Sequence, residues 1–304
     1  MHFALPFPSI APEIVSVEVF GITLALRWYA MAYIAGILIA WWMAARAVRS
    51  PALWPGPAPA RAEQIADLVT WVIVGIIVGG RLGFVVFYEP AYFLANPLEI
   101  PAIWQGGMAF HGGFIGVAVA GFFYLRSQGI PLLPLADVMA LATPPALALG
   151  RVANFINAEL WGRPTDAPWG VIFPGTAAQA CPGPVGIVAG GLCARHPSQL
   201  YEAALEGVLL CLVLLWLVYR RGAFHRPGLV LGVFLAGYGL ARFLVELFRQ
   251  ADPQFITAEN PVGWVVTLGP VGLTMGQLLS LPMVLIGAVF IARAKRRSDP
   301  QPSA

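Results

Sequence analysis

The polar side chains of Gly150–Gly162, which reads GRVANFINAELWG, stand at the end of an otherwise apolar run. On a helix, Arg151 and Asn154 are neighbours, and Asn157 adds a further turn of polar side chains. A charge inside bilayer hydrocarbon costs roughly 2.5 to 3.5 kcal/mol on insertion scales, so such a residue usually has a partner or a function. The alternative is an arginine that reaches the headgroups beside helix-capping asparagines. The clustering favours a functional site.

Other ionisable or aromatic polar side chains stand in or beside the remaining apolar runs: Tyr29, Arg81, His111, Glu202, Tyr238, Arg242, Glu246 and Arg249. The last four recur at positions i, i+4, i+8 and i+11, which makes one stripe on a helix. Each residue alone has a structural explanation, such as an ion pair of Arg242 with Glu246 or an interfacial position for Tyr29. All of them fall in the same half of the predicted membrane span, which favours one shared polar cavity.

Glycines flank His111 on both sides, at positions 106, 107, 112, 113 and 116. Small residues let a backbone or a ligand approach closely, so these glycines are consistent with a cavity. Packing between helices explains them equally well, above all for Gly112 and Gly116, which have the GxxxG spacing. A phosphate-binding loop is disfavoured, because no strand precedes the glycines and no Gly-Lys-Ser/Thr follows them.

The composition indicates a polytopic membrane protein. Of 304 residues, 59% are hydrophobic and only 11% are charged, whereas soluble domains carry about 25% charged residues. The net charge of +3 comes from dispersed basic residues, nearly all arginine, so no nucleic-acid partner is indicated. The first residues lack a basic segment ahead of a short apolar core, and we expect no cleaved signal peptide.

Seven runs are long and apolar enough to cross a bilayer, which predicts an all-α bundle of seven transmembrane helices. The runs are approximately Leu24 to Met43, Ile65 to Phe87, Met108 to Leu125, Val138 to Asn157, Leu200 to Tyr219, Gly228 to Phe248 and Met275 to Ala292. Basic residues concentrate in one alternating set of loops, including Arg46, Arg61, Arg126, Arg220 and Arg296. The positive-inside rule therefore places the N-terminus outside and the C-terminus in the cytoplasm.

We expect one membrane domain over residues 1–304, with a small external head at about 161–196. Cys181 and Cys193 share this external segment and could pair if the compartment is oxidising. Cys211 lies within an apolar run and is expected to pack as a small hydrophobic side chain.

An outward-facing cavity with several arginines and one histidine suits an anionic amphiphile such as a phospholipid, since arginine binds phosphate bidentately. The chain lacks a GxSxG elbow, an HExxH motif and an acidic metal cluster, which disfavours serine-type and metal-type hydrolysis. A displacement with phosphate as leaving group remains. A phospholipid transporter or flippase is the alternative, but its polar path should continue to the cytoplasmic side, where only Asp67 and Asp137 are found.

The segment GRVANFINAELWG closely resembles the signature of the prolipoprotein diacylglyceryl transferases, and further segments agree in order: RWYAMAYIAG, GGRLGFVVFYEP, GGMAFHGGFIG, RHPSQLYEAALEG and GYGLARFLVELFRQAD. The resemblance covers nearly the whole chain and is weakest at Pro51 to Arg61 and at Gly175 to Gly191. It implies transfer of the diacylglyceryl group from phosphatidylglycerol to the lipobox cysteine thiol of a prolipoprotein, which forms a thioether and releases glycerol-1-phosphate. It also implies a bacterial inner-membrane protein without a cofactor or metal, whose active site faces the outer half of the bilayer.

The resemblance also assigns residues. It implies that His111 is the essential histidine and that Arg151 and Arg242 contact the phosphate, with Tyr29 and Tyr238 as further catalytic residues. Other motif positions, which we expect to contribute to phosphatidylglycerol binding, are Asn154, Glu159, Gly162, Arg81 and Glu246. A thiol has a pKa of about 8.5, so the nucleophile needs a base or a positive field, which His111 or the arginines could supply.

Overall fold

The computed structural model describes residues 3–19, 22–257, 259–269 and 271–295. The described chain is mostly helical, and it divides into two compact units. Among the described residues, the first unit comprises 3–40 and 140–295, and the second comprises Trp41–Met139.

Five helical stretches of the described chain are long and apolar enough to cross a membrane. They are α1 (Trp28–Val48), α2 (Ala62–Phe87), α5 and α6 together (Leu132–Ala142 and Pro144–Ile156), α8, η5 and α9 together (Ser198–Glu202, Ala203–Leu209 and Leu210–Arg221), and α11 (Met275–Arg293). The other two predicted runs coincide with α4 (Phe110–Ser127) and with the shorter apolar helix α10 (Leu229–Val245). The helical class is confirmed, whereas seven crossings and their orientation stay predictions.

An antiparallel hairpin precedes the first long helix. Strand β2 (Glu13–Val19) pairs with β3 (Ile22–Arg27), and the Glu13 carboxylate binds the Arg27 guanidinium at 3.2 Å. Helix α1 begins at Trp28, so the prediction of a helix from Leu24 is wrong at this end. Hydropathy alone does not separate an apolar strand from the first turn of an apolar helix.

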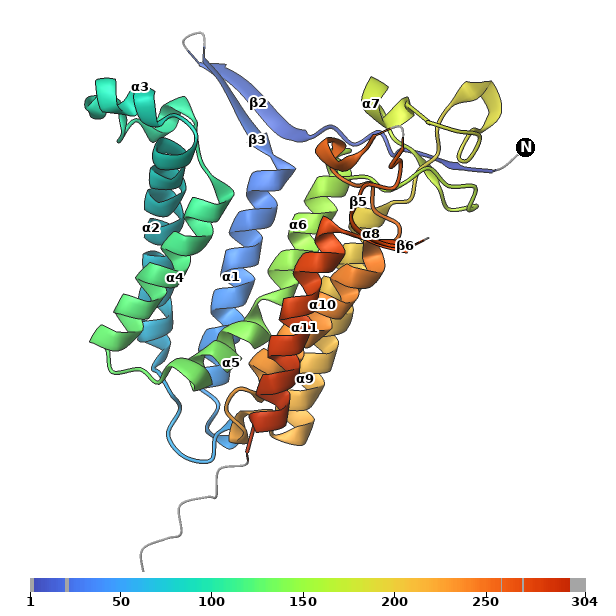
Figure 1. Ribbon diagram of the computed structural model, residues 1–304. Coiled ribbons are helices and arrows are strands. Elements are labelled where there is room, and N and C mark those ends of the chain that lie inside the picture. Colours follow the sequence, from blue (N-terminus) through green and yellow to red (C-terminus); the bar gives the residue numbers. More distant parts are fainter. Residues whose placement is uncertain (1–2, 20–21, 258, 270, 296–304) are drawn as a thin grey trace, which may run out of the picture. The chain divides into compact units, whose positions relative to one another are not determined.

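In the first unit, α1, α6, α8 to α11 and their connections build the frame of the candidate site (Figure 1). Two consecutive prolines open α6, where the missing N–H groups cost nothing, and they separate it from α5. Helix α6 packs closely on η5, a π-helical segment, since a Cβ at Gly207 would lie 2.8 Å from the Ala148 Cα atom. Helix α1 approaches α6 in the same way, at Gly36 and Ala146.

Helices α10 and α11 also pack through glycines, because a Cβ at Gly287 would lie 2.6 Å from the Gly232 carbonyl oxygen. A second hairpin, β5 (Trp264–Leu268) and β6 (Val271–Thr274), leads into α11. Thr274 then caps the helix, and its hydroxyl accepts the Gln277 N–H at 3.3 Å. Short helices complete this unit: α7 (Thr176–Gln179), η4 (Ala189–Gly191), η6 (Ala223–His225) and η7 (Pro253–Phe255).

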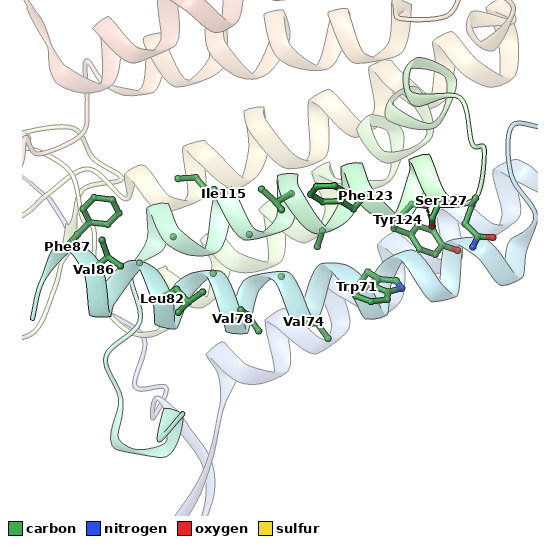
Figure 2. Close-up of a pocket in the computed structure, with 18 residues that line it drawn as sticks. Trp71, Val74, Val78, Leu82, Val86, Phe87, Ile115, Phe123, Tyr124 and Ser127 are labelled. Carbon is green, nitrogen blue, oxygen red and sulfur yellow. Dashed lines mark hydrogen bonds between the residues drawn. The ribbon is translucent and has the colours of Figure 1, made fainter. Parts of the chain in front are cut away.

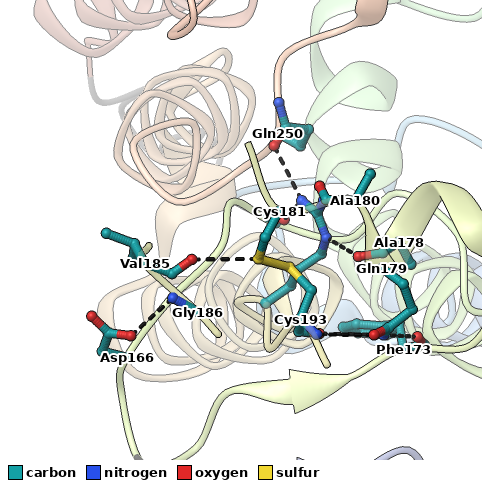
Figure 3. Close-up of a disulfide and its surroundings, with 12 residues drawn as sticks. Asp166, Phe173, Ala178, Gln179, Ala180, Cys181, Val185, Gly186, Cys193 and Gln250 are labelled. Carbon is teal, nitrogen blue, oxygen red and sulfur yellow. Dashed lines mark hydrogen bonds between the residues drawn. A yellow bond between two sulfur atoms is a disulfide. The ribbon is translucent and has the colours of Figure 1, made fainter. Parts of the chain in front are cut away.

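The segment that follows α6 folds against the N-terminal residues. Strand β1 (Leu5–Pro6) pairs in parallel with β4 (Val171–Ile172), around a small core centred on the fully buried Phe173. Cys181 and Cys193 form a disulfide, with Cα atoms 5.7 Å apart (Figure 3). The pairing that the sequence left open is therefore present in the structure.

Arg195 joins the two ends of this segment. Its guanidinium donates to the carbonyl oxygens of Ala178, Ala180 and Gly162, and it lies 3.9 Å over the Trp161 ring. Burial lowers the pKa of this guanidinium to about 10, because the charged form is poorly solvated there. The carbonyls and the ring compensate for that cost.

In the second unit, α2 and α4 pack with their backbones in close contact. A Cβ at Gly75 would lie 2.6 Å from the Gly116 carbonyl oxygen, and one at Gly83 would lie 2.7 Å from the Gly112 Cα atom. The same two helices line an apolar groove of about 870 Å³, which runs from Phe87 to Ser127 (Figure 2). Helix packing thus accounts for Gly112 and Gly116. The remaining short helices are η1 (Pro51–Leu53), α3 (Pro90–Ala95), η2 (Pro97–Glu99) and η3 (Ile103–Gln105).

Candidate active site

Three arginines of the first unit meet at the carboxylate of Glu202. Arg151 on α6 places its Nε atom 3.1 Å from Oε2, while Arg242 on α10 and Arg249 beyond that helix both contact Oε1, the latter at 3.1 Å. The Glu202 side chain is fully buried. One carboxylate therefore holds guanidinium groups from two different helices.

Two further carboxylates lie on the outer edges of this group. Arg242 Nη2 is 2.7 Å from Glu246 Oε2, and Arg151 Nη2 is 3.6 Å from Glu206 Oε2. Glu246 also lies against the first turn of α11, because a Cβ at Gly276 would be 2.5 Å from its carboxylate. Three arginines are thus matched by three glutamates, as buried charges require.

The two glutamates that contact Arg151 lie immediately before and within a π-helical segment. Glu202 ends α8 and Glu206 lies within η5. Such segments are rare and occur frequently at functional sites, because the wider turn re-aims the side chains. Helix α8 is itself attached to the turn after α6, since Ser198 Oγ donates to the Leu160 carbonyl at 3.1 Å and Gln199 Nε2 to that of Glu159 at 2.5 Å.

The guanidinium groups keep part of their surface accessible. The side chains of Arg151 and Arg242 are 20% and 16% exposed. Each guanidinium has five N–H groups, more than the carboxylates use, so both arginines retain donors for a second anion. Two accessible guanidinium groups that converge from different helices form an anion site suited to phosphate.

Tyrosines border Arg151 on two sides. Tyr238 on α10 lies within electrostatic range of Arg151. On α1, the hydroxyls of Tyr29 and Tyr33 are 3.1 Å apart, and Tyr33 lies within electrostatic range of Arg151 and Glu159. Tyr238 is therefore near Arg151, and Tyr29 is connected to this group through its contact with Tyr33.

The turn after α6 contains two residues other than glycine with positive φ angles. Ala158 and Leu160 have φ angles of 53° and 56°, a region that residues other than glycine rarely adopt. Asn154 Nδ2 donates to Glu159 Oε1 at 2.7 Å and thereby closes this turn. The Asn154 side chain is buried, so the pair fixes the end of the helix that carries Arg151.

Gly162 allows two segments to cross at this turn. A Cβ there would lie 2.5 Å from the Phe248 carbonyl oxygen and 2.7 Å from that of His196, and the Gly162 N–H donates to His196 at 2.8 Å. Gly162 also forms an isolated β-bridge with Arg249. The close approach of backbones accounts for this glycine and links the turn to the arginine cluster.

Arg81 belongs to the second unit and has structural partners. Its buried guanidinium donates four hydrogen bonds, at 2.6 to 3.3 Å, to the carbonyl oxygens of Glu99, Ile100, Gly106 and Gly107, and it lies 4.9 Å over the Phe93 ring. These bonds use four of its five N–H groups. The predicted role in substrate binding stays a prediction, whereas a role in holding residues 99–107 is evident.

His111 lies in the first turn of α4, where its side chain is exposed. It also belongs to the second unit, so the arginine cluster of the first unit is built without it. Among the described residues, no three His, Cys, Asp or Glu side chains are grouped so that they could hold a metal ion.

The sequence placed Glu202 and Arg249 in a shared polar cavity without a catalytic or binding role and did not single out Glu206, although all three contribute to the cluster. A signal for the glutamates was present, because two acidic residues four positions apart within an apolar run rarely occur without a partner. Glu206 escaped attention because its neighbours are all apolar or small.

Comparison with known proteins places this arrangement in context. Residues 17–293 match the family model described as prolipoprotein diacylglyceryl transferase. A Ruegeria pomeroyi protein named phosphatidylglycerol–prolipoprotein diacylglyceryl transferase is 62% identical over 296 residues, which cover 97% of this chain and 99% of that protein. A protein of the same name from Nitrobacter winogradskyi is 46% identical over 309 residues, with 100% and 96% covered.

Proposed function

We infer that this chain, which belongs to the prolipoprotein diacylglyceryl transferase family and is a transferase, moves the diacylglyceryl group of phosphatidylglycerol onto the thiol of a prolipoprotein lipobox cysteine. The products are a thioether and glycerol-1-phosphate, and the reaction is the first step of bacterial lipoprotein maturation. The close relatives support this activity over that of a phospholipid transporter.

The observation that carries the site assignment is the convergence of Arg151 and Arg242 on one anionic group. In the reaction, the cysteine sulfur attacks the glyceryl carbon, the bond from that carbon to the phosphate oxygen breaks, and its electron pair stays on the phosphate. The two arginines neutralise the charge that develops on that oxygen. They do so without being deprotonated, because arginine stays charged in proteins.

The thiol proton must leave before or during the attack, and His111 is our proposed base. Glu246 orients Arg242, because its carboxylate contacts that guanidinium, and Tyr238 acts within electrostatic range of Arg151. Tyr29 supports these residues indirectly, through the hydrogen bond between its hydroxyl and that of Tyr33.

Asn154, Glu159 and Gly162 contribute to phosphatidylglycerol binding by shaping the turn that ends α6. Arg81 contributes indirectly, through the backbone of residues 99–107.

We place the site toward the outer face of the bacterial inner membrane, with seven crossings and the N-terminus outside. The disulfide between Cys181 and Cys193 supports this orientation, because disulfides persist in oxidising compartments. The disulfide-bearing segment begins at the turn after α6, next to the arginines, and Gly162 pairs there with Arg249.

Transfer is tested by incubating the purified protein with phosphatidylglycerol and a lipobox peptide, followed by mass spectrometry. We expect the peptide to gain one diacylglyceryl group and glycerol phosphate to appear in equal amount. A peptide with serine in place of the cysteine is the matched control and should stay unmodified. If the peptide gains no mass although the purified protein is correctly folded, the proposal is contradicted.

A further inference from the structure

The Glu202 carboxylate occupies the point where the two proposed phosphate-binding arginines meet. We propose that Glu202 is a positioning residue, which holds Arg151 and Arg242 at the separation that the phosphate of phosphatidylglycerol requires. This inference rests on the proposed function, because it takes the phosphate to bind these two guanidinium groups.

The contacts divide the carboxylate between its partners. Oε2 receives Arg151, and Oε1 receives Arg242 together with Arg249. Three positive groups so close together repel one another, and a shared buried anion reverses that repulsion. Of the carboxylate contacts in the described residues, loss of Glu202 would leave Arg151 the longer one to Glu206, at 3.6 Å, and Arg242 the one to Glu246.

Rigid support makes Glu202 suitable for positioning. It lies at the junction of α8 and η5, and the two residues of α8 that bond to the turn after α6 are Ser198 and Gln199. Five residues beyond Glu202, Gly207 packs against Ala148 of α6. Arginine side chains have much rotamer freedom, so an anchor fixed in this way removes an entropic cost that substrate binding would otherwise carry.

Glu206 provides a matched control. It lies four residues further along the chain and is equally buried, yet within the described part of the chain it forms a single ion pair, at 3.6 Å, with Arg151. Glu202→Gln and Glu206→Gln both keep the shape of the side chain and replace the carboxyl group by an amide. If Glu202 positions both arginines, the first substitution should impair phospholipid use far more than the second.

The experiment measures KM and kcat separately for phosphatidylglycerol and for the lipobox peptide. For Glu202→Gln we expect the phosphatidylglycerol KM to rise by about tenfold or more, and for Glu206→Gln by less than about threefold. The peptide KM should stay near the wild-type value in both. A general loss of structure would raise the KM for phosphatidylglycerol and the KM for the peptide alike. A rise in the phosphatidylglycerol KM alone therefore separates positioning from a merely structural role.

Glu202→Asp keeps the charge but shortens the reach, and we expect a smaller rise, of about threefold or more, in the same KM alone. This variant decides the matter if Glu202→Gln does not fold. A phosphatidylglycerol KM that stays at the wild-type value in the folded Glu202 variant would overturn the proposal, as would an equal rise for the peptide.

Arg151→Lys and Arg242→Lys distinguish this failure from failure of the proposed function. If both lysine variants raise the phosphatidylglycerol KM while the Glu202 variants leave it unchanged, the phosphate site stands and the positioning role of Glu202 falls. If the lysine variants also leave that KM unchanged, the phosphate does not bind these arginines.

Discussion

Replacing Gly116 by alanine should separate α2 from α4. A Cβ at Gly116 would lie 2.9 Å from the Gly75 carbonyl carbon and 3.0 Å from the Gly79 Cα atom, and it would overlap the Gly75 carbonyl oxygen. Carbon atoms prefer separations of about 3.5 to 4.0 Å, so the helices must move apart by roughly half an ångström or more. Overpacking of this kind costs about 1 to 3 kcal/mol, because the obstructing atoms belong to the backbone.

Gly121 on the same helix is the control. A Cβ there would have no heavy atom within 4 Å, and alanine is favoured over glycine inside a helix by about 0.5 to 1 kcal/mol. Both positions lie within α4 and gain this preference alike, so the unfolding free energies of Gly116→Ala and Gly121→Ala should differ by the overpacking cost alone, about 1 to 3 kcal/mol.

Chemical unfolding of the purified variants in one detergent, together with hydrogen exchange of the amides of α2 and α4, measures this difference. We expect faster exchange in both helices for Gly116→Ala and wild-type or slower exchange for Gly121→Ala. Equal stability of the two variants would refute the packing argument. Loss of transfer by Gly116→Ala without faster exchange would restore the interpretation of the glycine as a place for ligand approach.

Further predictions concern the disulfide, the histidine and two arginines. Cys181→Ser with Cys193→Ser should leave transfer unchanged but destabilise the segment by about 3 kcal/mol, the chain-entropy value for a separation of 12 residues; hydrogen exchange measures this, and loss of transfer in the folded variant would contradict it. His111→Gln should lower kcat while the phosphatidylglycerol KM stays near wild type, and a joint collapse would make the histidine a headgroup ligand. Arg242→Lys should lower transfer by about tenfold or more, since one ammonium cannot reproduce a guanidinium shared between two carboxylates and a phosphate; near wild-type initial rates would contradict this. Arg81→Lys should expose residues 99–107 to limited proteolysis, because lysine cannot donate to four carbonyls in fixed directions.

Much of the helical architecture follows from run length and hydropathy. Helices α2 and α11 begin and end within a few residues of the predicted runs, because a bilayer demands about 20 apolar residues whatever the partner. That Arg151 and Arg242 have acidic partners was also predictable, since a charge in an apolar run must be compensated; their joint contact with a phosphate stays a prediction.

Features that depend on contacts between distant parts of the chain could not be predicted from the sequence. Nothing local showed that Glu202 would be the shared anion, because that depends on how α8 and η5 pack on α6 and α10. The last residues of β3, from Leu24, were predicted to begin the first helix, since this end of the strand is largely apolar too. The sequence left open whether Gly116 serves helix packing or a cavity, and the close contact with Gly75 decides for helix packing.

The most direct test of the shared phosphate site is an experimental structure with phosphatidylglycerol or a non-reactive analogue bound. We expect oxygens of one phosphate group to lie within hydrogen-bonding distance of both the Arg151 and the Arg242 guanidinium, with Glu202 still in contact with each arginine. A phosphate that binds elsewhere, or that contacts neither of these arginines, would contradict the account.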